Sequence, residues 1–205
     1  LSNSFFKKSE NNFNDSQIKK LLNSRLKISS SVKLAIIKLG HTGVNYNHYY
    51  GQGDTYSDEM SINKNNQEQL SNIVKRSNRV KDLSIVPSFL LPTEVSIANL
   101  RDTAALMQAN YLIIIKTNSS TDFNYNLFSK NEAVAIANME VGVVDVLSGA
   151  IPFTSLVTGN VKIKKNNDED FNSREFQVRA RTVAESEAYE VLSKTLVDLF
   201  NSKSL

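Results

Sequence analysis

Two long β segments joined by a short turn constrain this chain more than any other feature. The first segment is AVAIANMEVGVVDVL, at residues 133–147. In it, apolar residues alternate with polar or small ones, and the apolar set is Ala135, Ala137, Met139, Val141 and Val143. Because successive side chains of a strand point to opposite faces, one face of this strand is expected to be buried. The second segment, AIPFTSLVTGNVKIKK at 150–165, follows a Ser148-Gly149 joint, which predicts an antiparallel hairpin.

Three further strands are predicted upstream of the hairpin. VKLAIIKLG at 32–40 is short, apolar and ends in glycine, as a buried strand does. NYLIIIKT at 110–117 is a continuous apolar run expected at the centre of a sheet, and the polar NSSTD that follows it is expected to break the strand. LSIVPSFLLP at 83–92 reads as a strand that its two prolines limit to an edge or an early end.

Apolar residues at helical spacing predict three helices in the body of the chain. The expected ranges are 67–81, 96–109 and 173–200. The expected inward faces are Leu70, Ile73, Val74, Ser77 and Val80 in the first, Ile97, Leu100, Ala104 and Met107 in the second, and Val183, Ala188, Val191, Leu192, Leu196 and Leu199 in the third. The small Ala104 and Ala105 are expected to allow close packing of the second helix on a sheet.

The resulting order is β-loop-α-β-α-β-β-β-α, which predicts a mixed α/β (α+β) fold in a single domain spanning 31–205. We expect a mixed sheet with a long antiparallel hairpin, helices packed on it and a long C-terminal helix. A chain of 205 residues with 40% hydrophobic residues is long and apolar enough to bury such a core.

Residues 1–30 are expected to form a basic polar tether. Leu1 to Lys38 holds eight Lys or Arg and two Asp or Glu, a local excess of +6, so the remainder carries about −3 of the net +3. Within the tether, DSQIKKLLNSRLKI predicts a short amphipathic helix with Ile18, Leu21, Leu22 and Leu26 on one face. We favour docking of this helix on its own domain, and a membrane-surface helix is the alternative.

The start of the chain favours an exported protein. It begins at Leu1 and not at methionine, so an upstream segment is expected to have been removed. A lipoprotein cut just after its lipidated cysteine would begin this way. The chain itself has no cysteine, which excludes disulfides and thiolate chemistry, and no apolar run approaches the ~20 residues needed to span a bilayer.

Three stretches together carry a family resemblance. LRDTAALMQANYLIIIKT joins an alanine-rich helix to a strand through QANY, MEVGVVDVLSGAIPFTSLVTG places an aspartate before a Ser-Gly turn, and a long helix closes the chain. This resembles the α/β domain of the curli-secretion lipoprotein family and of the amino-terminal domain of the Tol system's propeller protein. The matching positions are Ala109 to Leu112 and Val144 to Gly149, with Asn110 in place of the usual aspartate and Ser148 in place of threonine. The resemblance covers roughly residues 32–200.

The resemblance implies a bacterial envelope protein, often lipid-anchored, that binds or assembles and does not catalyse. Its expected location is the periplasm or the outer membrane, with an envelope protein or a glycan as partner, or with self-assembly. The motif residues themselves favour a structural role. Asp145 can accept backbone N–H bonds beside Ser148 in the turn, and Gly149 can adopt a positive φ.

The loop HTGVNYNHYYGQGDTY, residues 41–56, is the candidate binding site. It contains both histidines of the chain, four of its seven tyrosines and three of its seven glycines. Tyrosine offers a large contact area with few rotors, while Gly and Asn let the backbone adapt. A loop of about 25 residues within a compact domain is also unusual. The candidate binding residues are His41, Tyr46, His48, Tyr49, Tyr50, Asp54 and Tyr56.

Other interpretations of the loop remain open. His41, His48 and Asp54 could hold a zinc-type ion in a metal-assisted hydrolase, and an ordinary mobile loop without a partner is the third interpretation. No nucleophile or phosphate-binding motif occurs in the chain, so we expect neither catalysis nor a cofactor. The basic arm lacks aromatic stacking motifs and joins a body without basic excess, so no nucleic-acid partner is expected.

Overall fold

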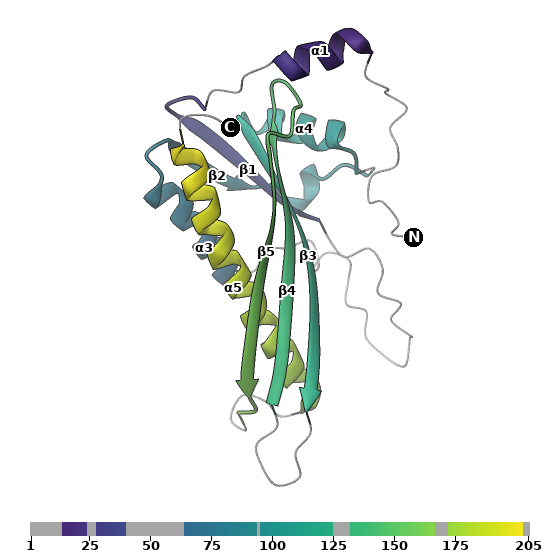
Figure 1. Ribbon diagram of the computed structural model, residues 1–205, viewed down its shortest axis with the longest axis vertical. Coiled ribbons are helices and arrows are strands. Elements are labelled where there is room, and N and C mark those ends of the chain that lie inside the picture. The colour runs from purple at the N-terminus through teal and green to yellow at the C-terminus, as the bar shows by residue number, and fades with distance from the viewer. Residues whose placement is uncertain are drawn as a thin grey trace.

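The described residues form one five-stranded mixed sheet with helices on it (Figure 1). The computed structural model describes residues 14–23, 28–39, 64–93, 95–124, 132–166 and 172–202. In chain order the elements are α1 (Asp15–Asn23), β1 (Val32–Leu39), α3 (Lys64–Arg76), β2 (Val80–Ile85), the 3-10 helix η1 (Ser88–Leu90), α4 (Ile97–Leu106), β3 (Tyr111–Asn124), β4 (Glu132–Asp145), β5 (Phe153–Lys164) and α5 (Ser173–Asn201). The predicted fold class, with its long hairpin and C-terminal helix, is confirmed.

The parallel half of the sheet is covered on both faces. Strand order is β2-β1-β3-β4-β5, and β1 pairs in parallel with both β2 and β3. Leu70 and Ile73 of α3 belong to the core on one face, whereas Leu100 and Ala104 of α4 belong to the core on the other. Double coverage is the reason that β1 and the start of β3 read as continuous apolar runs. β3 lies at the centre of the sheet, as predicted.

The antiparallel half consists of three long strands, and β3 is longer than predicted. The β3–β4 pairing runs without interruption from Tyr111↔Asp145 to Asn124↔Glu132. The polar NSSTD segment was expected to end the strand, and this expectation is wrong. Within that segment Asn118, Ser120 and Asp122 are exposed or half-exposed on one face, and the unbroken backbone ladder with β4 holds these residues extended.

Two element boundaries differ from the prediction near β2. The helix expected to reach Lys81 ends at Arg76, because the Ser77 hydroxyl accepts bonds from the backbone N–H groups of Arg79 and Val80, both at 3.3 Å. Val80 therefore begins β2 and does not extend the helix. The strand expected over 83–92 ends at Ile85, because Pro87 has no N–H for the ladder and precedes η1. β2 is an edge strand, as its prolines indicated.

Small side chains bring α5 close to β4 and β5. Ala180, Ala184 and Ala188 of α5 are fully buried, and so are the alanines of β4 that face α5: Ala133, Ala135 and Ala137. At Gly159 of β5 an added Cβ would meet the backbone of Ala184. The helix backbone therefore lies almost directly on the strand, and the aromatic rings of Phe176 and Phe200 fill the spaces at the two helix ends.

The inward face of α5 was predicted only in part. Ala188, Leu192 and Leu196 are buried as expected. Val183 and Val191 are each 38% exposed, so their assignment to the inward face is wrong. The buried residues recur four apart from Phe176 to Phe200, and Val183 and Val191 each precede a buried position by one residue, about 100° around the helix.

Side chains of α5 also occupy the free edge of β5. The backbone N–H of Asn160 donates to the Glu187 carboxylate at 2.9 Å, and Arg179 donates to the carbonyl oxygen of Lys164 at 2.9 Å. These two bonds satisfy backbone groups that an edge strand would otherwise leave open.

The polypeptide joins the body at Ile28, beside the start of β1. Ile28 is buried, its carbonyl accepts from the Arg79 guanidinium at 3.2 Å, and Val32 N–H donates to the Arg79 carbonyl at 2.8 Å. The preceding helix α1 exposes Ile18 and Leu22, so the expected docking of these two residues on the domain is not observed. Among the described helices, none has the length and apolar character needed to cross a membrane.

Candidate binding site

A hydrogen-bonded corner joins the two sequence stretches that carry the family resemblance. Asn110, between α4 and β3, donates its backbone N–H to the Lys33 carbonyl at 2.8 Å. Its side-chain oxygen accepts the Lys33 N–H at 2.7 Å, and its own carbonyl accepts the Val146 N–H at 3.0 Å. One asparagine therefore links β1, the start of β3 and the β4–β5 turn.

The β4–β5 turn is held by Asp145. One oxygen of its carboxylate accepts from the Ser148 backbone N–H at 2.6 Å and from the Ser148 hydroxyl at 2.7 Å. Gly149 has a φ of 76°, and a side chain there would meet the guanidinium of Arg101 on α4. Because the carboxylate and the glycine are both used to close the turn, this corner is organised as a rigid support.

A second polar cluster lies between β1, β3 and α5, at the carboxyl end of β1. Lys38 Nζ is 4.0 Å from Glu185 Oε2, and the two side chains are only 14% and 21% exposed. The Ser119 hydroxyl lies 3.4 Å from Glu185 Oε1. A largely buried ion pair has to be compensated by such neighbours because removal of either charge from water is costly.

Tyr189 lies next to this cluster and is fully buried. Burial raises the pKa of its phenol, and the charge of Glu185 raises that pKa further, while Thr117 acts in the opposite direction. The hydroxyls of Thr117, Thr121 and Tyr189 are buried without a hydrogen-bond partner among the described residues, so Thr117 and Tyr189 approach each other without good bonding geometry. The phenol therefore stays protonated at neutral pH.

Helix α3 completes the cluster from the other side. Gln69 Nε2 donates to the Ser186 hydroxyl at 2.7 Å, and the Ser193 hydroxyl donates to the Gln69 carbonyl at 3.0 Å. These bonds hold α3 against α5. Together with Lys38 and Glu185 they make the interior between the helices and the sheet unusually polar for the centre of a domain.

The candidate binding loop is attached at this same place. Residues 40–63 connect Leu39, the last residue of β1, to Lys64, the first of α3. β1 is also the strand at which the connections diverge, because α3 lies on one face of the sheet and α4 on the other. In open α/β sheets ligands tend to bind outside the carboxyl ends of strands at such a point. The residues His41, Tyr46, His48, Tyr49, Tyr50, Asp54 and Tyr56 themselves lie outside the described residues.

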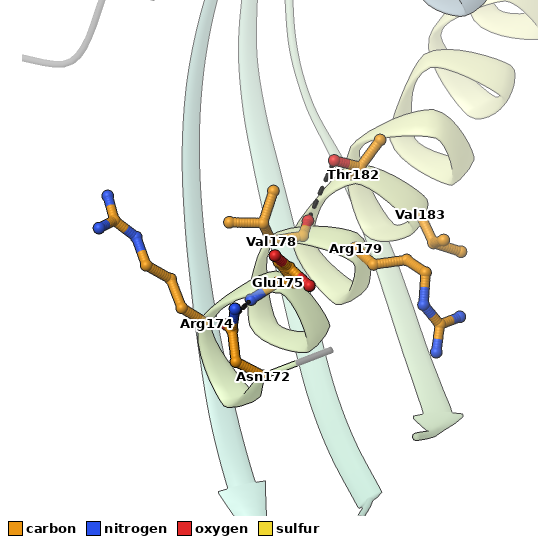
Figure 2. A pocket seen from close by; sticks show the side chains of 7 residues that line it. All are labelled: Asn172, Arg174, Glu175, Val178, Arg179, Thr182 and Val183. Atoms are coloured by element: carbon orange, nitrogen blue, oxygen red, sulfur yellow. Dashed lines mark hydrogen bonds between the residues drawn. The ribbon is translucent and has the colours of Figure 1, made fainter. Parts of the chain in front are cut away.

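A hollow on the described surface has a different location. It has a volume of about 500 Å³ and lies along the first turns of α5, lined by Asn172, Arg174, Glu175, Val178, Arg179, Thr182 and Val183. Figure 2 shows Arg174 and Arg179 pointing to opposite sides of the helix. Asn172 caps the helix by accepting the Glu175 N–H at 2.9 Å, and Arg179 lies over the Phe176 ring at 5.5 Å. All of these residues come from one segment, so the hollow brings no distant groups together.

The described residues offer little for acid–base or metal chemistry. Within them, no group of three or more His, Cys, Asp or Glu side chains is placed to hold a metal ion. The metal-assisted interpretation depends on His41, His48 and Asp54, which lie outside the described residues. Sequence reasoning missed the cluster of Lys38, Glu185 and Tyr189. Its visible signal was Lys38, one of two lysines in an otherwise apolar strand.

Comparisons with known proteins find distant structural similarity. No protein-family model matches the sequence, and no curated protein matches it. Distantly similar solved structures do occur, and several of them are bacterial lipoproteins.

Three of these structures show how distant the similarity is. A hypothetical protein from Chlamydia trachomatis has a TM-score of 0.42 and 11% identity, covering 84% of this chain and 97% of that one. PelC from Paraburkholderia phytofirmans, solved as a dodecamer, has a TM-score of 0.38 and 12% identity, with coverages of 85% and 95%. A minor lipoprotein from Acinetobacter baumannii has a TM-score of 0.38 and 6% identity, with coverages of 82% and 90%. TM-scores this low assign neither a partner nor an activity to this chain.

Proposed function

We propose that this protein is an exported, lipid-anchored component of the bacterial envelope that binds or assembles other envelope components and does not catalyse a reaction. Its location in this proposal is the periplasm or the outer membrane. The observation that carries the proposal is the corner at Asn110, where the two motif stretches of the family resemblance meet.

The corner supports a scaffold function because its polar groups bond to the backbone. Asn110 bonds to Lys33 and Val146, and Asp145 bonds to Ser148. Each of these contacts fixes the geometry of a turn or a strand end. The one hydroxyl paired with a carboxylate here, Ser148 with Asp145, is part of the turn itself, because the same carboxylate oxygen also accepts the Ser148 backbone N–H.

In this proposal the partner is bound by the loop after β1. The loop leaves β1 at Leu39, directly after Lys38 of the polar cluster, and the chain continues into α3 at Lys64. The tyrosines and histidines of residues 41–56 would supply contact area and hydrogen bonds to an envelope protein or a glycan. Self-association through the same loop is the second mode.

The anchor is tested by lipid labelling. The gene is expressed in a bacterial host with its native upstream segment, in the presence of a clickable fatty acid, and the cells are fractionated. We expect label at a cysteine directly before Leu1, with the protein in the membrane fraction. Unlabelled protein in the cytoplasm would overturn the proposal.

The binding role is tested by crosslinking. A photoreactive residue is placed at Tyr49 or Tyr50, and a control is placed at the exposed Leu156 on β5. We expect defined adducts from the loop positions and none from the control. Equal adducts from all three positions would remove the loop from the proposal, and a substrate turnover that His41→Ala abolishes would remove the non-catalytic assignment.

A further inference from the structure

Three exposed apolar side chains gather around the corner described above. Leu106 ends α4, Leu147 lies at the tip of the β4–β5 turn, and Ile151 follows that turn. They are 76%, 94% and 43% exposed. We infer that this corner patch, defined as Leu106, Leu147 and Ile151, rests on an anionic membrane surface. The inference deepens the proposed function by giving the anchored domain an orientation.

The patch is presented by a rigid part of the molecule. The Asp145 carboxylate closes the turn that carries Leu147, and Val146 N–H is bonded to the Asn110 carbonyl. Arg101 of α4 lies against Gly149 of the turn. Leu147 therefore projects from a turn of fixed geometry. A leucine exposed to this extent at a fixed position is available for contact with another apolar surface.

The tether reaches the body at the same end. The chain becomes part of the body at Ile28, which Arg79 holds beside the start of β1. The start of β1, the start of β3 and the β4–β5 turn lie together because β1 pairs with β3 from Leu34↔Tyr111 onward and Tyr111 pairs with Asp145. Figure 1 shows α1 at this end as well, above α4 and the turn.

Helix α1 has the composition of a surface-binding helix. It exposes Ile18 and Leu22, the latter at 81%, and Lys19 is exposed beside them. Short amphipathic helices with lysines on the polar face bind at the boundary between headgroups and acyl chains. The apolar residues of α1 and of the corner patch would then enter the same interface.

The charge distribution selects an anionic surface. Residues 1–38 carry an excess of +6, while the remainder sums to about −3. At the patch end the described bases include Lys33, Arg79 and Arg101, and the described acids include Asp82, Asp102 and Asp145. Asp82 is the register partner of Lys33, and the Asp145 carboxylate is already bonded within its turn, so the excess positive charge comes from the tether. Basic groups near a membrane are attracted by anionic headgroups, and this attraction weakens with salt.

A lipid surface fits this end better than a second copy of the chain. The tether joins the domain at this end. A lipid anchor on the tether would therefore bring this end to the bilayer without any further recognition. A second copy would have to bring its own basic tether against the basic tether of the first. The apolar contact of the patch is small, which suits a surface that is already held nearby by the tether.

The test uses the absence of tryptophan from the chain. Leu147→Trp introduces a single fluorophore into the patch, and Leu156→Trp introduces one at an exposed leucine on β5 away from it. The purified, unlipidated chain is mixed with vesicles of phosphatidylcholine alone or with added phosphatidylglycerol. We expect a blue shift only for Leu147→Trp and only with anionic vesicles, reversed by salt.

Flotation with the same vesicles measures how much the corner patch contributes to membrane binding. Leu106→Ser combined with Leu147→Ser is expected to weaken binding to anionic vesicles about 10-fold or more, because two leucines lose their apolar contact. Leu156→Ser should bind as the unchanged chain does. Circular dichroism checks the fold, and if the double variant does not fold, Leu147→Ser alone is used.

Several outcomes would overturn the inference. These are no binding to anionic vesicles, equal binding by the double variant and the control, or a blue shift of Leu147→Trp that depends on protein concentration without vesicles, which would indicate a second copy. Because these measurements use unlipidated protein, vesicle binding without lipid labelling in cells would refute the anchor alone. Labelling without vesicle binding would refute the patch alone.

Discussion

In the parallel half of the sheet, β1 is buried on both faces, whereas in the antiparallel half β4 is buried on one face only. The difference follows from the helices. α3 and α4 cover opposite faces of the parallel half, while α5 covers one face of the long hairpin. The other face of the hairpin presents polar side chains such as Asn118, Thr158 and Asn160. The same sheet is therefore a buried layer at one end and a one-sided surface at the other.

The largest loss of stability is expected where α5 packs closely on the hairpin. Gly159→Ala places a Cβ against the Ala184 carbonyl and 2.6 Å from the Ala188 nitrogen. These are backbone atoms, so α5 would have to move, and we expect a loss of about 3 kcal/mol or more in the free energy of unfolding. Urea unfolding measures it.

Gly142→Ala on β4 is the matched control, because nothing lies within 4 Å of its added Cβ. It should change stability by no more than about 1 kcal/mol. Equal stability of the two variants would contradict the direct contact between α5 and β5.

Two isoleucines on neighbouring strands sharpen the comparison between the covered and open faces. Ile113 of β3 is fully buried under α5, whereas Ile136 of β4 is half-buried on the open face. Ile113→Ala should cost about 3–4 kcal/mol through lost burial and a cavity. Ile136→Ala should cost about 1 kcal/mol. Chemical denaturation that gave both the same cost would mean that the open face is covered in solution.

The polar cluster under α5 predicts a smaller and pH-dependent effect. The Tyr189 hydroxyl is buried without a partner among the described residues, so Tyr189→Phe should leave stability unchanged or raise it by up to about 1 kcal/mol at neutral pH. Burial raises the pKa of Tyr189 above its ordinary value of 10. The folded state therefore disfavours the phenolate of Tyr189. The contribution of this group to the free energy of unfolding is fully present below pH 10, the ordinary pKa of tyrosine, and is lost as the pH rises beyond it.

Unfolding measured across the alkaline range should accordingly decline less steeply for Tyr189→Phe than for the unchanged chain. Part of the decline should remain, because burial and the charge of Asp145 also raise the pKa of Tyr111. An identical slope for the variant and the parent would show that Tyr189 is accessible to water.

The smallest effect is expected at the far end of the hairpin. Glu132 and Lys162 are 2.7 Å apart on the open face, and the hydrogen bond from Lys162 lowers the pKa of Glu132. Because the pair is exposed to solvent and salt, Glu132→Gln should leave the unfolding midpoint unchanged at physiological ionic strength. A measurable drop would indicate that this end of the sheet is less exposed than the open face elsewhere.

Much of the fold could be predicted because its signals are local. The alternation from Ala135 to Val143 indicates which face of β4 is buried. The continuous apolar run before Lys116 indicates that β3 lies at the centre of the sheet. The polar half of β3 could not be predicted in this way. Its residues are held extended by the pairing with β4, which runs through fourteen residue pairs over the whole of β3, and that pairing is not encoded in the polar segment alone.

The face of α5 and the polar cluster were hidden for other reasons. Alanine is compatible with either side of a helix, so the buried stripe through Ala180 and Ala184 gave no more signal than the exposed Val183. Lys38 and Glu185 lie near opposite ends of the chain, and only the packing of α5 brings them together. The turn at Asp145 was easier to predict, because an aspartate followed at a fixed offset by Ser148 and Gly149 is a local pattern. The bonds of Asn110 to Lys33 join segments far apart in the sequence and were not predicted.

The bonds from Glu187 and Arg179 to the edge of β5 bear on how the protein behaves at high concentration. A strand from another molecule that added to β5 would need the Asn160 N–H and the Lys164 carbonyl, and both are already taken. Sheet extension over that part of the edge would first require Glu187 and Arg179 to release these two groups. The two bonds therefore hinder amyloid-like growth along the second half of β5.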